Sequence, residues 1–169
     1  MSWPLAYAKQ ARSDLAARAC LLEHPELSQC HQLHFLQMAC EKLCKAHLCG
    51  SGVDPEQLRR SHAFVASVLP VIVRQHLARQ TSQLPRNTGW VYQASKRYAR
   101  LIELLAPAVT GGGFVPSNCE YPWSGPDARV VVPAEHNFRF DFLHERGGRT
   151  LLKIVSAVAD NLVRTHSNK

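Results

Sequence analysis

Apolar residues recur at three- and four-residue steps along most of the chain, and this period predicts helices. The first helix is predicted over about 5–23, before Pro25, with Ala8, Ala11 and Leu15 on its stripe. The second is predicted over about 26–49 and ends at Gly50-Ser51-Gly52. Because the two segments are similar in length and joined by a short turn, we expect an antiparallel helical hairpin.

Three further helices are predicted after this hairpin. Asp54-Pro55-Glu56-Gln57 has the cap and the first-turn proline of a helix start, and the helical pattern runs to about Gln80 with a break or kink at Pro70. The next helix runs from Asn87-Thr88 to Pro107, and an amphipathic helix ends near His166. The stripe expected to be buried on the helix before Pro107 consists of Trp90, Ala94, Tyr98, Leu101 and Leu105.

The segment between Arg129 and Phe142 has a period of two instead. Val130-Val131-Val132 is β-branched, and Phe138, Phe140 and Phe142 alternate with polar residues. This pattern predicts a small β-hairpin whose Phe face lies against the helices. The expected fold is therefore all-α: one domain over 1–169, an up-and-down bundle of four to five helices with a small β-hairpin excursion.

Composition is consistent with one folded domain. The chain has 169 residues, of which 46% are hydrophobic and 20% charged, and this excludes disorder throughout. No run approaches the roughly 18 apolar residues of a membrane span, and the first residues lack the pattern of a secretory signal. We therefore expect a cytoplasmic protein with no membrane partner, in which the cysteines are thiols.

The net charge of +7 is concentrated in the middle of the chain. Residues 51–100 carry 8 Lys/Arg against 2 Asp/Glu, an excess of +6, whereas residues 1–50 carry 5 against 4 and residues 101–169 carry 7 against 7. A localised excess favours a polyanionic partner, and the alternative interpretation is a solvated basic face.

The second predicted helix carries a recognisable pattern. Residues 34–46 read HFLQMACEKLCKA, with Gln37, Ala39, Glu41-Lys42 and Lys45-Ala46 at the spacing of a family signature. This segment resembles the HEPN family, the higher eukaryotes and prokaryotes nucleotide-binding domain. Ala11, Asp14-Leu15 and Ala17 resemble the preceding helix of that family, Ser61-His62 its Thr-His pair, and Tyr121-Pro122 its Arg-Tyr-Pro element. The resemblance covers residues 3–64 and becomes vague afterwards.

The resemblance implies a helical bundle that commonly dimerises. Family members are implicated in nucleotide binding, in RNA cleavage by toxins and defence systems, and in partnership with nucleotidyltransferases. Two departures matter, because Glu120 stands where the family has Arg and Ala63 where it usually has Asp. A carboxylate at position 120 cannot bind phosphate as a guanidinium does.

The nuclease motif of the family is an Arg followed, after four to six residues, by a His. Arg86-Asn87 opens a predicted helix as that motif does, but no His lies four to seven places on. The other pairs at this spacing are expected by chance alone. They are Arg18…His24, Arg129…His136 and Arg139…His144. We interpret the motif as absent or degenerate and assign no catalytic residue.

A zinc site is the other chemistry considered. Cys40, Cys44 and His47 share one helix face and could supply three ligands. That face is also the predicted buried stripe, and the chain has no Cys-x-x-Cys pair. We predict no metal and no cofactor.

Candidate binding residues follow from the charge and from the resemblance. Lys42 and Lys45 either face a phosphate or, with Gln37 and Glu41, hold the helices in register. Phe35 and Met38 point away from the main apolar face and need cover from another helix of the same chain or from a second subunit. With the resemblance, they are predicted to form a homodimer interface. The predicted nucleotide- or RNA-binding residues centre on positions 59, 60 and 62; they are Lys42, Lys45, Arg59, Arg60, His62, Arg86, Arg97 and Arg100. The wider basic surface predicted for RNA or phosphate also includes Arg74, Arg79 and Lys96.

Three functions remain open at this point. The first is a nucleotide- or RNA-binding module, in a toxin–antitoxin or defence system and with a nucleotidyltransferase as a candidate partner. The second is a metal-independent toxin-type ribonuclease, and the third a non-catalytic adaptor that docks onto a larger partner. Binding that weakens with salt indicates the first, metal-independent RNA cleavage the second, and neither property the third.

Overall fold

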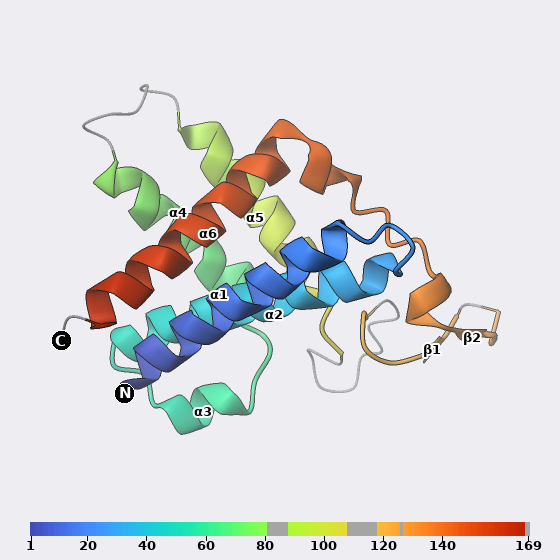
Figure 1. Cartoon of the computed structure of the whole chain (residues 1–169), viewed down its shortest axis with the longest axis horizontal. Coiled ribbons are helices and arrows are strands. Elements are labelled where there is room, and N and C mark those ends of the chain that lie inside the picture. Colours follow the sequence, from blue (N-terminus) through green and yellow to red (C-terminus); the bar gives the residue numbers. More distant parts are fainter. Residues whose placement is uncertain (81–87, 108–117, 126, 168–169) are drawn as a thin grey trace.

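The computed structural model describes residues 1–80, 88–107, 118–125 and 127–167. Within these residues the chain is mostly helical with one two-stranded antiparallel sheet, which confirms the expected fold class (Figure 1). The helices and strands are α1 (Trp3–Leu22), α2 (Gln29–Gly50), α3 (Pro55–Arg59), α4 (Val65–Arg79), α5 (Gly89–Glu103), β1 (Trp123–Ser124), β2 (Val130–Val131) and α6 (Arg146–Ser167). Two short 3-10 turns, η1 (Pro133–Glu135) and η2 (Asp141–His144), precede α6.

Helices α1 and α2 form the predicted antiparallel hairpin and lie side by side in Figure 1. Fully buried alanines, Ala8 and Ala11 on α1 and Ala39 and Ala46 on α2, let the two backbones approach closely. The Ser28 hydroxyl caps α2 by accepting from the Cys30 amide.

Helices α4, α5 and α6 complete the bundle around α2. Helix α2 contacts all three of them, and α6 crosses in front of α4 and α5 in Figure 1. Leu36, Leu43, Leu69, Ile102 and Leu151 are among the largest fully buried side chains, so the core lies where α2, α4, α5 and α6 meet. Among the described helices, none is long and apolar enough to cross a membrane.

Of the break or kink expected at Pro70, the break is wrong. The helical stretch is interrupted earlier, at residues 60–64, and Pro70 lies inside α4. Glu103 of α5 starts α4 by accepting a hydrogen bond from the Ala66 amide at 2.8 Å. The proline costs α4 one backbone hydrogen bond, but the helix continues because its Leu69 and Val73 face is buried.

The position of the β-hairpin is also wrong. Strand β1 pairs with β2 in the register Trp123↔Val131 and Ser124↔Val130, so the hairpin begins before Arg129. The three phenylalanines lie in an irregular segment, because Arg139 adopts a φ of +50° that turns the chain out of an extended path. Their burial against the helices is confirmed, and the ring of Phe142 stacks on Tyr98 at 4.3 Å.

The set of buried residues predicted for α5 is shifted by one position over part of the helix. Trp90 is exposed, whereas Val91, Ser95, Ala99 and Ile102 are buried together with the predicted Tyr98. The exposed Trp90 ring lies under the Arg146 guanidinium at 4.7 Å. The Trp90 ring, which the apolar pattern assigned to the core, therefore lies on the exposed side of α5 beside a cation.

One glycine has no room for a side chain. A Cβ built on Gly148 would lie 2.1 Å from the Phe142 carbonyl oxygen and 2.7 Å from the Leu143 Cα. Both atoms belong to backbone that a side-chain rotation cannot move. Glycine therefore lets the first turn of α6 pack directly on η2.

Candidate functional site

The most extensively bonded polar residue of α2 is Glu41, which is 1% exposed. Its carboxylate accepts from Lys45 Nζ at 2.7 Å, from Gln37 Nε2 at 3.0 Å and faces His62 Nδ1 at 2.9 Å. Burial by itself raises the pKa of Glu41, but these three hydrogen bonds and the Lys45 charge outweigh it, so the pKa lies below its ordinary value. The ionised carboxylate fixes the Nδ1 proton of His62 and ties the segment after α3 to α2.

Of the two roles predicted for Lys45, phosphate binding and holding the helices in register, this network supports the second. Its side chain is 4% exposed and its ammonium is bound to a buried carboxylate. Lys42 is half-buried, and its Nζ lies 3.2 Å from Met38 Sδ. Burial lowers the pKa of Lys42, partly offset by Glu41 and Asp14. Neither ammonium projects freely into solvent.

The remaining predicted binding residues do not converge on one site. Arg59 is exposed and paired with Glu56 at 3.1 Å, and Arg60 is exposed at the end of α3. Arg97 lies over the Tyr98 ring at 5.9 Å, and Arg100 is exposed in the last turn of α5. Helices α3 and α5 are well separated in Figure 1. Arg86 lies outside the described residues.

The two residues predicted for a dimer interface are half-buried. Phe35 meets the His34 ring edge-on at 5.5 Å, and Met38 is partly covered by the Lys42 side chain. His34 in turn faces Glu120 at 3.5 Å. Glu120, which replaces the Arg of the family pattern, therefore has an imidazole partner instead of a phosphate.

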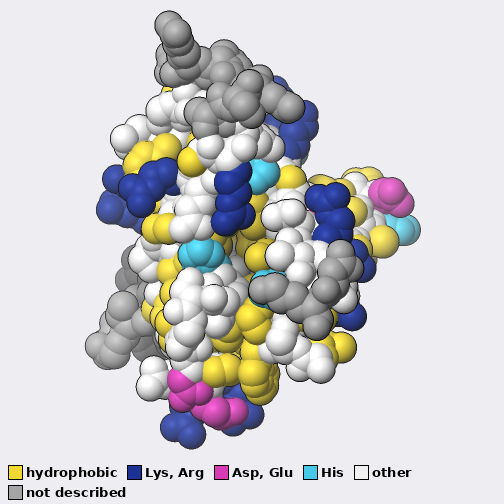
Figure 2. Space-filling view, turned by 90° about the vertical axis from the view of Figure 1, so that its left-hand side faces the viewer, with side chains coloured by type: hydrophobic (Ala, Val, Ile, Leu, Met, Phe, Trp, Pro, Cys, Tyr) yellow, Lys and Arg dark blue, Asp and Glu magenta, His cyan; other side chains and the backbone are white. Residues whose placement is uncertain are grey.

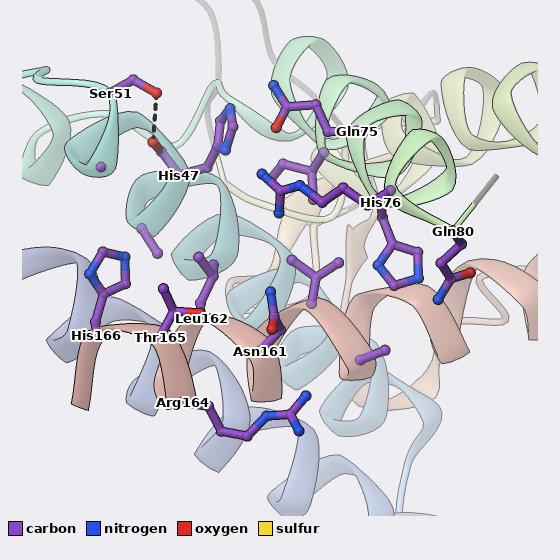
Figure 3. A pocket seen from close by; sticks show the side chains of 16 residues that line it. His47, Ser51, Gln75, His76, Gln80, Asn161, Leu162, Arg164, Thr165 and His166 are labelled. Atoms are coloured by element: carbon purple, nitrogen blue, oxygen red, sulfur yellow. Dashed lines mark hydrogen bonds between the residues drawn. The ribbon is translucent and has the colours of Figure 1, made fainter. Parts of the chain in front are cut away.

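A pocket of about 630 Å³ lies at the other end of α2, between α2, α4 and α6 (Figure 3). Its walls come from the C-terminal parts of these three helices. Each helix contributes one histidine: His47 from α2, His76 from α4 and His166 from α6. The other lining residues are Ala46, Gly50, Ser51, Ile72, Gln75, Arg79, Gln80, Ala157, Val158, Asn161, Leu162, Arg164 and Thr165.

The charges around this pocket have one sign. Arg79 and Arg164 line it, and no Asp or Glu is among the described residues that do so. Figure 2 shows this face: His side chains lie toward its middle with cationic side chains beside them, further Lys and Arg are spread to its sides and its bottom, and the visible acidic side chains lie at the bottom and the right edge. Arg164 extends away from the three imidazoles, along the other side of α6 (Figure 3). Arg79 is therefore the guanidinium best placed to act with the histidines.

Burial and Arg79 set the protonation of two of these histidines. Burial, and after it the Arg79 charge, lowers the pKa of both His47 and His76. Each imidazole is therefore neutral at pH 7, with one nitrogen that donates and one that accepts. Arg79 and both of these histidines line the same pocket.

The helix ends add a charge of the opposite sign. The C-terminal end of a helix carries a partial negative charge, and three such ends meet here. Arg79, in the last turn of α4, offsets this charge, whereas His47, His76 and His166 lie in the last turns of their helices and offset it only when they are protonated. Compensation of the helix ends is thus the structural explanation for these residues, and it competes with a binding role.

The pocket also offers neutral polar groups above an apolar floor. Gln75, Gln80 and Asn161 supply amides, and the Ser51 hydroxyl is held by a 3.1 Å hydrogen bond to the His47 carbonyl. Ile72 and Leu162 supply apolar surface. Small-molecule sites also combine donors, acceptors and apolar surface, but they are mostly apolar, whereas most of the residues that line this pocket are polar.

Of the residues that the sequence predicts as a basic surface for phosphate, Arg79 alone is among the described residues that line this pocket, and the residues on which that prediction centred are not. Arg79 belongs to the basic stretch 51–100, and this charge excess was the available signal for it. His47, His76 and His166 are far apart in the sequence and share no motif. Their convergence depends on the packing of α2, α4 and α6, which no local pattern encodes.

Metal chemistry finds no support in the described part of the chain. No group of three His, Cys, Asp or Glu side chains within it is placed to hold a metal ion. Cys40 and Cys44 are buried in the core, and all six cysteines are free thiols.

No protein-family model, no curated protein and no solved structure matches this chain. The geometry of the pocket and the residues of the sequence pattern are therefore the basis for a functional proposal.

Proposed function

We propose that this protein is an HEPN-like helical module that binds a nucleotide or RNA through phosphate, and that the pocket between α2, α4 and α6 receives the phosphate. The observation that carries the proposal is the convergence of Arg79 and three histidines on a pocket with no carboxylate among its described lining residues. A guanidinium binds two phosphate oxygens at once, and imidazole N–H groups donate to the rest.

The sequence pattern of residues 34–46 supports the same proposal from a separate direction. It resembles a family implicated in nucleotide binding, and the Arg–His spacing of its nucleases is not met in a helix-opening context. A toxin–antitoxin or defence role in the cytoplasm, with a nucleotidyltransferase partner, belongs to this proposal.

Binding by the full chain tests it. Fluorescence anisotropy with labelled adenosine monophosphate and with a labelled 12-nucleotide RNA should show binding that weakens with salt. Each phosphate contact should cost about three- to fourfold in affinity between roughly 50 and 200 mM salt. Binding of neither probe at low salt would overturn the proposal and leave the adaptor function in its place.

Two variants locate the binding surface. Arg79→Gln should weaken binding, whereas the double variant Arg59→Ala/Arg60→Ala, on exposed positions of the α3 segment, should retain it. The opposite result would return the site to the residues favoured by the charge pattern. Circular dichroism of each variant checks that the helices are intact.

A metal-independent ribonuclease is the second candidate, and one observation favours it. His62 is held by the buried carboxylate of Glu41 at 2.9 Å, while its side chain is 49% exposed. A carboxylate that orients a solvent-facing imidazole is the arrangement of a general base. RNA cleavage in the presence of a chelator, lost in His62→Gln, would establish this activity, and intact RNA would exclude it.

The homodimer is proposed on Phe35 and Met38, whose half-buried side chains lie on one side of α2. An isologous contact covers one such patch with its copy. Analytical ultracentrifugation should show a dimer at micromolar concentration that Phe35→Asp dissociates. A monomeric parent protein would refute the interface.

A further inference from the structure

We propose that the pocket between α2, α4 and α6 binds a single nucleoside monophosphate, and not a nucleic-acid strand. This inference rests on the proposed function and narrows it to one class of ligand. The phosphate lies against Arg79 between His47 and His76, and the nucleoside lies toward the α6 wall.

The size of the pocket suits one nucleotide. Its volume of about 630 Å³ lies within the range of about 300–1,000 Å³ that small-molecule sites occupy. The histidines of α2, α4 and α6 lie on different walls of the pocket in Figure 3. The donors therefore surround a compact group instead of following a line across the surface.

The electrostatics of the helix ends favour one phosphate over many. The C-terminal ends of three helices surround the pocket, and each places a partial negative charge there. A single phosphate in contact with Arg79 gains a guanidinium fork that outweighs these charges. A strand would place further phosphates at the same helix ends, where no second guanidinium faces the three imidazoles. The partial negative charges of the helix ends would repel these additional phosphates.

The surroundings lack the features of a strand-binding surface. Such surfaces combine a row of cations with aromatic rings on which successive bases stack. No Phe, Tyr or Trp is among the described residues that line the pocket. The cations of α5 do not extend the site, since Lys96 and Arg97 lie over the tyrosine rings of their own helix at 4.8 and 5.9 Å.

The neutral polar groups fit the rest of a nucleotide. Gln75, Gln80 and Asn161 carry both donors and acceptors, as a ribose and the edge of a base require. Ile72 and Leu162 supply apolar surface for the base plane. A bare inorganic anion would leave all of these groups unused.

A terminal phosphate also matches the number of donors. A monoester presents three non-bridging oxygens, and a diester two. Arg79 offers five N–H groups, and each neutral imidazole offers one more. We therefore expect a monoester to be bound more tightly than a diester of the same nucleoside.

Isothermal titration calorimetry on the full chain tests this choice of ligand. The probes are the four ribonucleoside 5′-monophosphates, adenosine, 3′,5′-cyclic AMP as the matched diester, and a 12-nucleotide RNA without terminal phosphate. At least one monophosphate should bind tenfold more tightly than adenosine, the cyclic diester and the RNA. Tighter binding of the RNA, or equal binding of monoester and diester, would overturn the inference while the proposed function stands. Binding of no probe would overturn both.

Variants tie the binding to the pocket. Arg79→Gln should weaken monophosphate binding at least tenfold, and Arg79→Lys should weaken it less, because the charge remains but the fork is lost. Arg12→Gln removes the same charge from an exposed position of α1 outside the pocket and should bind as the parent does. If Arg79→Gln does not fold, His76→Gln provides the second test, with an expected loss of several-fold. Unchanged binding in a folded pocket variant would refute the site.

Discussion

Removal of the Lys45 ammonium is the sharpest test of how α2 is held in the bundle. In Lys45→Met the side chain keeps a similar length, but the charge that lies 2.7 Å from Glu41 Oε1 is lost. Glu41, at 1% exposure, would keep only Gln37 and the partly exposed His62 as partners. A buried carboxylate would then stand without its main counter-charge.

The expected cost is about 3–5 kcal/mol of unfolding free energy, the usual loss when one partner of a buried ion pair is removed. For a single domain of about 5–15 kcal/mol total stability this is a large fraction. The loss should be smaller at acid pH, because protonation of Glu41 removes the uncompensated charge. Replacing both partners, as in Glu41→Leu/Lys45→Met, should recover much of the stability.

Urea denaturation followed by circular dichroism at pH 7 measures these changes. The matched control is Arg59→Met, which breaks the exposed Arg59–Glu56 pair at 3.1 Å and should cost no more than about 1 kcal/mol. A loss of under about 1 kcal/mol in Lys45→Met would refute the reasoning. It would mean that Lys45 is not committed to the core and is available to a ligand, as the sequence resemblance allowed.

Three further predictions concern other parts of the molecule. Burial and Arg79 lower the pKa of His47 and His76, so the unfolded chain binds more protons than the folded one, and stability should fall as pH decreases below about 6.5. Thermal melts should show this fall. Sulfate, whose charge is constant over this pH range, should reduce the fall if it binds the pocket. Gly148→Ala should lose about 1–3 kcal/mol in urea denaturation because its Cβ meets backbone, whereas Gly89→Ala, with open space around it, should lose none. Cys20 is the one exposed thiol of the six, and it should react with a thiol reagent in the native state, whereas the four buried thiols should react only after unfolding.

Most of the helical fold could be predicted because its signals are local. The apolar period gave α1, α2 and α6, and Asp54 and Pro55 marked the start of α3. The end of α3 could not be read locally, because α4 is started by Glu103, a residue 37 positions from the amide it caps. The pairing of β1 with β2 could not be predicted for a similar reason. The phenylalanine alternation reports burial, whereas a strand also needs a partner, and Arg139 turns the chain away.

The candidate site was less predictable than the fold. Gln37, Glu41 and Lys45 were expected on one strip of α2, and the structure shows them bonded to one another, with His62 added. The pocket histidines belong to three helices and carry no common spacing. A charge excess over fifty residues points to a basic surface, but it does not distinguish Arg79 at a pocket from Arg59 in an exposed ion pair.

The basic residues of this chain can have two electrostatic roles, compensation of helix ends and binding of an anion, and a count of charges in the sequence does not separate them. Where the ends of α2, α4 and α6 meet, cationic side chains are favourable even without a ligand, by about 0.3–1 kcal/mol for each exposed one. A residue that only compensates a helix end contributes to stability and not to binding. Arg79 is distinguished from such a residue because its charge lowers the pKa of two half-buried imidazoles that line the same pocket, and because it has no carboxylate partner among the described ion pairs. The folded protein thus holds a guanidinium with no described carboxylate partner beside neutral donors, an arrangement that the proposed phosphate ligand would complete and that a helix dipole alone does not require.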